Sequence, residues 1–214
     1  MADIFQEVDE ELKREQYLDL WQKYGRYVIA AAVGVVAITA AIVFWRDYQA
    51  GQQMEESRRY EAAMALARDG KTQEALAAFG DVADESGASY TALASLQEGA
   101  LRAREGDLAG AAAAYERVAD DGGVDDILQD LATLLFVLYS LDSGEPAALS
   151  ERLAPLTQED NPWRFSAREL DAFIAVKTGD TDRARELFTQ LGDDQLAPQA
   201  LRGRASEMLS IIGK

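Results

Sequence analysis

Carboxylates are the side chains of this sequence with the most capacity for chemistry, because it holds 38 aspartates and glutamates but no histidine and no cysteine. Without imidazole or thiolate groups, the chain has no disulfide, no zinc site of the Cys/His type and none of the usual general bases or thiol nucleophiles. Acidic pairs alone are typical of solvated helix surfaces and helix ends. We therefore expect no catalytic residue, no cofactor and no small-molecule substrate.

One acidic stretch, Asp120-Asp-Gly-Gly-Val-Asp-Asp126, has residue types that could bind calcium. It lacks the alternate-position ligands and the distal glutamate of an EF-hand loop. Asp125 and Asp126 are also suitable N-caps for a helix that follows. The stretch therefore predicts a loop and a helix cap rather than a metal site.

The charge of the chain also limits its partners. The formal net charge is −17, and residues 46–214 alone hold seventeen basic and thirty-one acidic side chains. A field of this sign repels phosphate backbones, so nucleic-acid binding is excluded as a function.

The second set of residues with a possible function is apolar. In four segments, apolar residues recur at positions that would share one helix face, and none of them is charged. An apolar face of this kind could bind an apolar helix or an extended polypeptide; ordinary core packing is the alternative. The candidate protein-binding residues are Tyr60, Met64, Leu93, Leu96, Ala100, Leu131, Leu134, Leu138, Phe173 and Val176.

A repeat positions these residues. Gly70, Gly106 and Gly179 are each followed after five residues by alanine and after nine residues by an aromatic side chain. A degenerate copy begins at Gly144, with Leu149 and Leu153 at these two offsets. The glycines lie 36, 38 and 35 residues apart, close to the tetratricopeptide period of about 34. Each glycine would form the turn of an antiparallel helix pair, where a positive φ can be needed.

The repeat predicts an all-α fold made of four helix pairs and a last helix. A small residue seven positions before each glycine (Ala63, Gly99, Ala172, and Val137 in the degenerate copy) would let the two helices of a pair approach closely. Asn161 followed by Pro162 predicts the start of one helix. The concave surface of such a stack would come from the first helix of each pair. The predicted helices cover residues 52–69, 72–85, 90–105, 108–120, 126–142, 146–154, 162–178, 181–192 and 198–212.

Before the repeats lies an apolar run. Residues 28–45 contain no charge and would form a helix roughly 27 Å long, which matches the hydrocarbon core of a bilayer. Aromatic residues flank the run on both sides, as expected at membrane interfaces. A cleaved signal peptide and a buried core helix are the alternatives, but the leader here is 27 residues long and acidic, and the run lacks the polar face of a core helix. The expected organisation is an amphipathic segment at 1–27, a transmembrane helix at 28–45 and a tetratricopeptide-like domain at 46–214.

Two features of the first part of the chain could contact partners. Small residues at Ala30, Gly34, Ala37 and Ala41 would form a stripe on one face of the transmembrane helix, and such stripes allow helices to pack closely in lipid. Ile4, Phe5, Val8 and Leu12 stand at helical spacing; they predict an interfacial helix or a cytoplasmic partner contact.

Orientation follows from the basic residues around the span. Four of them (Lys13, Arg14, Lys23 and Arg26) precede it, and three (Arg46, Arg58 and Arg59) follow closely. The positive-inside rule then favours a cytoplasmic N-terminus and an exported C-terminal domain.

The order of these parts resembles the YfgM-like family, the ancillary subunits of the bacterial SecYEG translocon, in the form seen in alphaproteobacteria. The resemblance covers essentially the whole chain. It rests on the acidic Asp3–Glu11 helix, the Trp21-Gln-Lys-Tyr-Gly-Arg26 entry to the span, the degenerate repeats, Asn161-Pro-Trp-Arg164 and Leu201-Arg-Gly-Arg-Ala205-Ser-Glu-Met-Leu209.

The resemblance implies a single-pass protein of the bacterial inner membrane with its repeat domain in the periplasm. Its partners would be Sec translocon subunits, a membrane-anchored periplasmic chaperone and exported client proteins. The family has no catalytic residues to transfer. A different class of function remains open at this point: a structural or assembly subunit of another inner-membrane complex, held through the small-residue stripe.

Overall fold

The computed structural model describes the backbone of residues 2–213 and the side chains of residues 23–213 except Val28. Over residues 2–213 the chain is helical and has no strand, so the all-α prediction is confirmed. The chain divides into two compact units at Glu55/Glu56, ten residues beyond the predicted end of the apolar run. We describe each unit separately.

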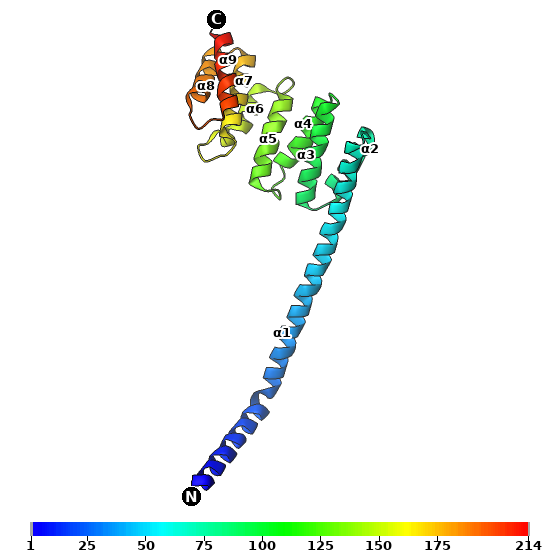
Figure 1. The fold of residues 1–214 in the computed structure, drawn as a ribbon, viewed down its shortest axis with the longest axis vertical. Helices are drawn as coiled ribbons and strands as arrows, with labels where there is room; N and C mark the ends of the chain where they lie inside the picture. The colour runs from blue at the N-terminus through cyan, green and yellow to red at the C-terminus, as the bar shows by residue number, and fades with distance from the viewer. Residues whose placement is uncertain (1, 214) are drawn as a thin grey trace. The chain divides into compact units, whose positions relative to one another are not determined.

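The first unit lies within helix α1 (Ala2–Arg68), drawn in blue to cyan in Figure 1. Between Lys23 and Arg68, α1 contains a window long and apolar enough to cross a membrane, and none of the described residues buries the side chains of that window. Residues from Ile29 to Trp45 are accordingly exposed, apart from a half-buried Gly34. The side chains of Ile4, Phe5, Val8 and Leu12 lie outside the described residues.

The second unit contains the end of α1 and eight further α-helices among the described residues (Figure 1). Every predicted helix is present, and the predicted ends agree within two residues, except that the first predicted helix is the end of α1. The helices are α2 (Thr72–Glu85), α3 (Ala88–Arg104), α4 (Leu108–Ala119), α5 (Asp126–Ser140), α6 (Pro146–Leu153), α7 (Arg164–Thr178), α8 (Thr181–Asp193) and α9 (Gln199–Ile212), with a 3₁₀ turn η1 (Ala154–Thr157).

The turn glycines confirm the predicted register. Gly70, Gly106 and Gly179 have φ angles of 73°, 84° and 78°, a left-handed conformation that suits glycine because it lacks a Cβ. Gly144, in the degenerate copy, is not among the glycines with positive φ. The predicted start of one helix is wrong by two residues: α7 begins at Arg164, after an N-cap at Trp163.

Asn161 nevertheless has a structural role in that loop. Its side-chain oxygen accepts a hydrogen bond from the Trp163 N–H at 2.8 Å, and its amide nitrogen donates to Asp130 of α5 at 2.7 Å. The Asn-Pro pair therefore forms a turn before the helix, because Asn161 bonds to a backbone group two residues ahead.

Small and aromatic residues interlock in the first, second and fourth pairs, as the repeat predicts. In the second pair, a Cβ placed on Gly99 would lie 2.7–3.0 Å from ring atoms of Tyr115, so only glycine fits beside that ring. In the first and fourth pairs, the corresponding alanines (Ala63 and Ala172) and the aromatics that follow are fully or almost fully buried.

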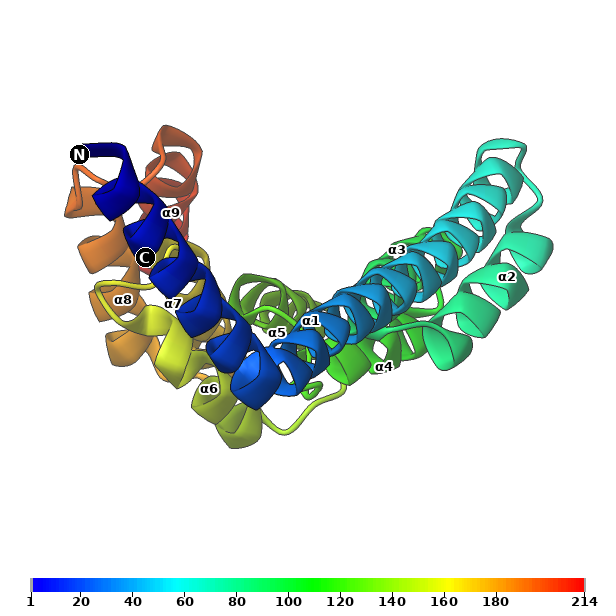
Figure 2. The ribbon, with the colours of Figure 1, turned by 90° about the horizontal axis from the view of Figure 1, so that it is seen from below.

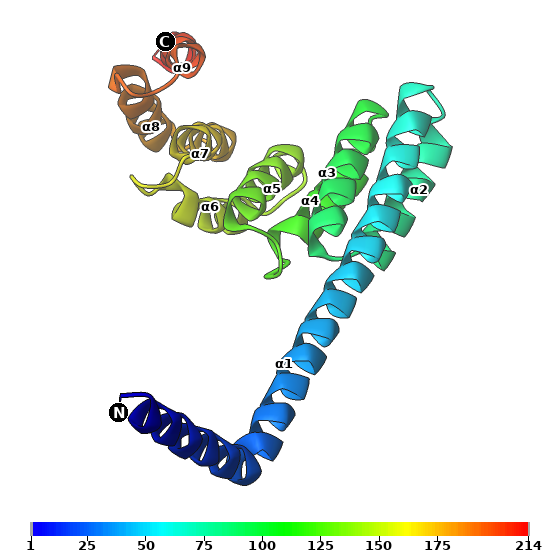
Figure 3. The same ribbon diagram turned by 60° about the horizontal axis from the view of Figure 1, so that its bottom comes forward.

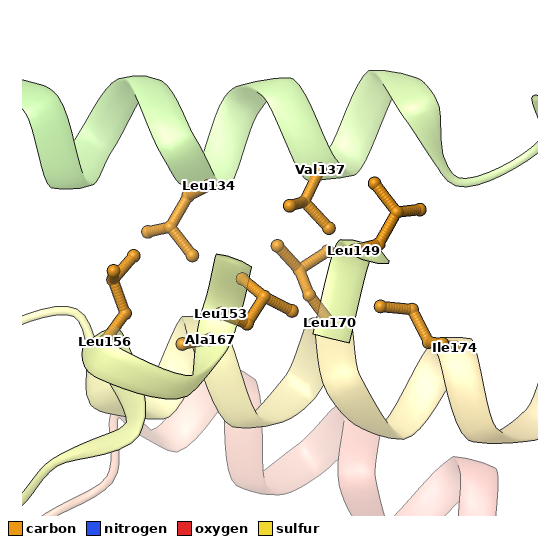
Figure 4. Close-up of a cluster of buried hydrophobic side chains, with 8 residues drawn as sticks. All are labelled: Leu134, Val137, Leu149, Leu153, Leu156, Ala167, Leu170 and Ile174. Atoms are coloured by element: carbon orange, nitrogen blue, oxygen red, sulfur yellow. The ribbon is translucent and has the colours of Figure 1, made fainter. Parts of the chain in front are cut away.

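The third pair is packed differently. Val137 of α5 and Leu153 of α6 occupy the small-residue and aromatic positions, and both are fully buried. Figure 4 shows their side chains converging between α5, α6 and α7, where they meet further aliphatic residues. This cluster consists of Leu134, Val137, Leu149, Leu153, Leu156, Ala167, Leu170 and Ile174.

The pairs stack into a curved row, with α2 and α8 at opposite ends of it (Figure 2). In Figure 3, α3, α5 and α7 lie along the inner side of this row, and α4 and α6 lie along the outer side. We call the inner side, formed by the first helix of each pair, the inner face. This arrangement places the residues of the first helices where a polypeptide could lie across several pairs.

Candidate protein-interaction surface

Three of the predicted binding residues are exposed in the structure, and they come from three successive first helices. Leu93 of α3, Leu138 of α5 and Val176 of α7 have exposed fractions of 38%, 44% and 38%. They lie in helices of the inner face and could gain burial against a partner. Each fully buried aliphatic side chain contributes about 1.5–3 kcal/mol, so partial burial of three is a substantial driving force.

Most of the other predicted binding residues are half-buried and contribute to the core as well as to the surface. The Tyr60 ring lies 6.0 Å from both Phe79 and Tyr90, and Phe173 packs edge-on against Phe188 at 5.5 Å. Met64 and Leu96 also pack against buried clusters. Leu131 and Ala100 are half-buried too. These side chains support the inner face but offer only part of their surface to a ligand.

Leu134 requires a correction. It is 6% exposed and belongs to the aliphatic cluster of the third pair, so it is core and does not line an open surface. The physical reason is its neighbour: the short α6 brings leucines against α5, and Leu134 fills the space beside them (Figure 4).

Buried charges fix the first helices onto the second helices of their pairs, a feature that the sequence analysis missed. Glu98 and Asp171 each stand eight residues before a turn glycine, and both are buried. Arg117 of α4 donates to Glu98, and Arg183 of α8 donates to Asp171 at 2.7 Å. In the third pair, Phe136 occupies the same offset. The guanidinium carbon of Arg152 in α6 lies 4.7 Å from the centroid of its ring.

A polar residue repeated at one offset within apolar helices is the signal that could have revealed this contact. A buried carboxylate needs a charged and hydrogen-bonded partner, because desolvation of an isolated charge costs several kcal/mol. The arginines of α4 and α8 provide that partner, so the two carboxylates are part of the scaffold.

Further ion pairs join neighbouring pairs of helices. Arg152 of α6 reaches back to Glu116 of α4 and to Asp120, the C-cap of that helix, at 3.2 and 3.0 Å. At the end of the stack, Glu169 of α7 accepts two hydrogen bonds from Arg204 of α9, both at 2.7 Å. These hydrogen bonds to Glu169 raise the pKa of the Arg204 guanidinium above its usual value. These contacts link helices of neighbouring pairs along the row.

The acidic stretch is a loop and a cap, as predicted. The Asp125 side chain accepts a hydrogen bond from the Ile127 N–H at the start of α5, and Asp121 accepts one from the Gly123 N–H. Asp120 pairs with Arg152. Within the described residues, no group of three acidic, histidine or cysteine side chains is arranged to hold a metal ion.

Among the side chains that the structure describes, none packs on the small-residue stripe in the apolar part of α1. Ala30, Ala37 and Ala41 are exposed, and a Cβ on Gly34 would meet nothing within 4 Å. The backbone there is accessible to close approach by another helix.

Comparison with known proteins gives one match. A family model described as "Tetratricopeptide repeat-like domain" matches residues 19–207. No curated protein and no solved structure matches the chain.

Proposed function

The chain belongs to the tetratricopeptide repeat-like family, and on this premise we propose that it is a membrane-anchored adaptor that binds other proteins at the Sec translocon. The family model covers residues 19–207, and such repeat domains typically act as non-catalytic protein-interaction modules. In this proposal the adaptor associates with translocon subunits and passes exported clients to a membrane-anchored periplasmic chaperone.

One observation carries the proposal: an exposed apolar window in α1 is followed directly by a row of helix pairs with exposed apolar side chains on its inner face. The first feature supports a membrane anchor, because an apolar helix with no internal partner is stable in lipid. The second supports the capture of polypeptides. The translocon as the site of action is supported by the resemblance to the YfgM-like family.

In the proposed topology, residues 28–45 span the bacterial inner membrane, residues 1–27 are cytoplasmic, and residues 46–214 are periplasmic. The basic residues before and after the span support this orientation. A reporter that is active only in the periplasm should be active when fused after Lys214 and inactive when fused before Met1. The opposite pattern would contradict the proposed location.

Affinity purification of the full chain in mild detergent tests the partners. We expect translocon subunits to co-purify, and we expect exported clients to be lost when Leu93, Leu138 and Val176 are changed to serine. Leu196 and Ile211 are matched controls, because both are strongly exposed but lie outside the first helices of the pairs. Serine at these two positions should leave recovery unchanged. Recovery of a different membrane complex without translocon subunits contradicts the proposal.

A second candidate function rests on the unpartnered small-residue stripe. In that case the chain would be a structural or assembly subunit, held in another inner-membrane complex through Ala30, Gly34, Ala37 and Ala41. Gly34→Leu with Ala37→Leu should then release the complex, because large side chains prevent close helix approach. Val36→Leu is the control, since Val36 lies on the opposite side of the helix and is already large.

A further inference from the structure

We propose that the inner face binds positively charged amphipathic polypeptide segments, with their apolar side chains on Leu93, Leu138 and Val176. This inference rests on the proposed adaptor function and adds the chemistry of the partner. It follows from two properties of the second unit that point the same way: the exposed apolar side chains of three first helices and the net negative charge of the unit.

The apolar part of the contact is already defined. The predicted binding positions on α3, α5 and α7 include no charged residue, and three of them are exposed. A segment with apolar side chains on one face could cover residues of several helices at once, as in other complexes in which an amphipathic helix docks on an apolar surface. The inner face alone therefore selects an amphipathic ligand without specifying its charge.

The charge of the second unit specifies the rest. Residues 56–214 hold sixteen basic and twenty-nine acidic side chains. Cations such as Arg102, Arg117, Arg183 and Arg204 are bound to acidic partners within the fold, which compensates their charge locally. The uncompensated charge is negative, and a field of this sign concentrates cationic ligands near the surface and repels anionic ones.

The same field argues against other occupants. A second copy of this chain would bring another negatively charged unit, and residues 1–27 also hold more acidic than basic side chains. Nucleic acids and anionic lipid headgroups carry the charge that the unit repels. A cationic amphipathic segment of another protein is the ligand that satisfies both the apolar and the electrostatic properties.

Binding of two designed peptides to the full chain in nanodiscs of zwitterionic lipid tests the proposal. Both peptides carry leucines on one helix face; one has lysines and the other has glutamates on the opposite face. We expect the lysine peptide to bind and the glutamate peptide to bind at least about tenfold more weakly. Raising the salt concentration should weaken binding of the lysine peptide, because salt screens charges beyond a Debye length of about 10 Å at 0.1 M. Empty nanodiscs measure binding to the lipid.

Matched variants place the peptide on the inner face. Serine at Leu93, Leu138 and Val176 should weaken binding of the lysine peptide at least about tenfold, equivalent to 1.4 kcal/mol. Serine at Leu196 and Ile211 should leave it unchanged. Equal binding of the two peptides, or equal effects of the two sets of substitutions, overturns the proposal. If translocon subunits and clients still co-purify in that case, the adaptor function stands, and only the proposed ligand chemistry or its place on the inner face is lost.

Discussion

The second and third helix pairs solve the same packing problem with different residues. In the second pair (α3 and α4), Gly99 lies against the Tyr115 ring, and the turn glycine Gly106 has a φ of 84°. In the third pair (α5 and α6), the same two positions hold Val137 and Leu153, and the turn at Gly144 needs no positive φ. The second helix of the pair also shortens, from twelve residues in α4 to eight in α6.

The difference teaches that the repeat preserves a shared volume rather than particular side chains. A very small residue opposite a large aromatic ring and two middle-sized aliphatic residues both fill the space between the helices of a pair. Cores tolerate such exchanges when the total volume is kept. The shorter second helix of the third pair can bury less apolar surface than α4. The third pair compensates with the additional leucines of its cluster.

The largest loss of stability should come from a large-to-small substitution in the aliphatic cluster of the third pair. Leu153 is fully buried, so Leu153→Ala removes buried methyl groups and leaves a cavity between α5 and α7. We expect a loss of ~2–5 kcal/mol in the free energy of unfolding. The thermal melt of the full chain in detergent measures it, with Leu196→Ala at an exposed position as the control. A loss no greater than that of the control would show that the cluster does not support the third pair.

We expect a smaller loss of stability when a larger side chain overpacks the contact between the helices of the second pair. Gly99→Val puts side-chain atoms where the Tyr115 ring lies, and overpacking of this kind costs ~1–3 kcal/mol. Combining it with Tyr115→Leu reproduces the Val and Leu of the third pair and should restore part of the loss. The double-mutant cycle on unfolding free energies measures this coupling. Additive effects of the two substitutions would break the comparison between the pairs.

The turn glycines should show a further, more modest difference. Gly106→Ala forces a Cβ into a left-handed backbone conformation, which costs ~1–2 kcal/mol. Gly80 in α2 is the control, because it is helical, has no positive φ and has space for a Cβ. Gly80→Ala should stabilise the fold slightly through helix propensity. A stabilising effect at Gly106 as well would mean that its left-handed turn is not required.

The smallest effect concerns the helix caps, which are Asp107 in the second pair and Glu145 in the third. Hydrogen bonds from the Gly110 N–H and from Arg102 lower the pKa of the Asp107 carboxyl below its ordinary value of 3.8. Its contribution to stability is therefore present above that ordinary value and is lost as the pH falls through the lowered one. Asp107→Asn keeps a good N-cap but removes the charge.

The melting temperatures of the wild type and Asp107→Asn should therefore differ at pH 7 and converge below pH ~3.8. A difference that is unchanged at low pH would assign the effect to the hydrogen bond alone and not to the charge. The same comparison for Glu145→Gln shows whether the cap of the third pair depends on charge to the same degree.

Local patterns made the helices and turns predictable from the sequence. Gly70, Gly106 and Gly179 mark turns because their positive φ favours glycine, and the alanines and aromatics at fixed offsets mark the contacts between helices. These constraints act within one pair, over short distances along the chain, so they are visible in the sequence.

The remaining features depend on neighbouring pairs. Leu134 has the same offset as the half-buried Tyr60 and Leu96, yet it is core, because only the third pair brings leucines against that position. Arg152 contacts residues 36 and 32 positions earlier, a pairing that no local pattern shows. The Asn161 prediction was wrong because the side chain caps a turn and not the helix.

The aliphatic cluster of the third pair affects how the domain unfolds. In a row of repeats, each pair is stabilised mainly by its neighbours, so the weakest junction decides whether the row unfolds in one transition or in two. The third pair is the junction between the helices before it and α7 to α9. Its leucines bridge α5, α6 and α7, and Arg152 ties it to α4. Because the degenerate copy is packed to both neighbours, we expect the domain to unfold in one transition and to give a protease no stable half-folded intermediate to cut.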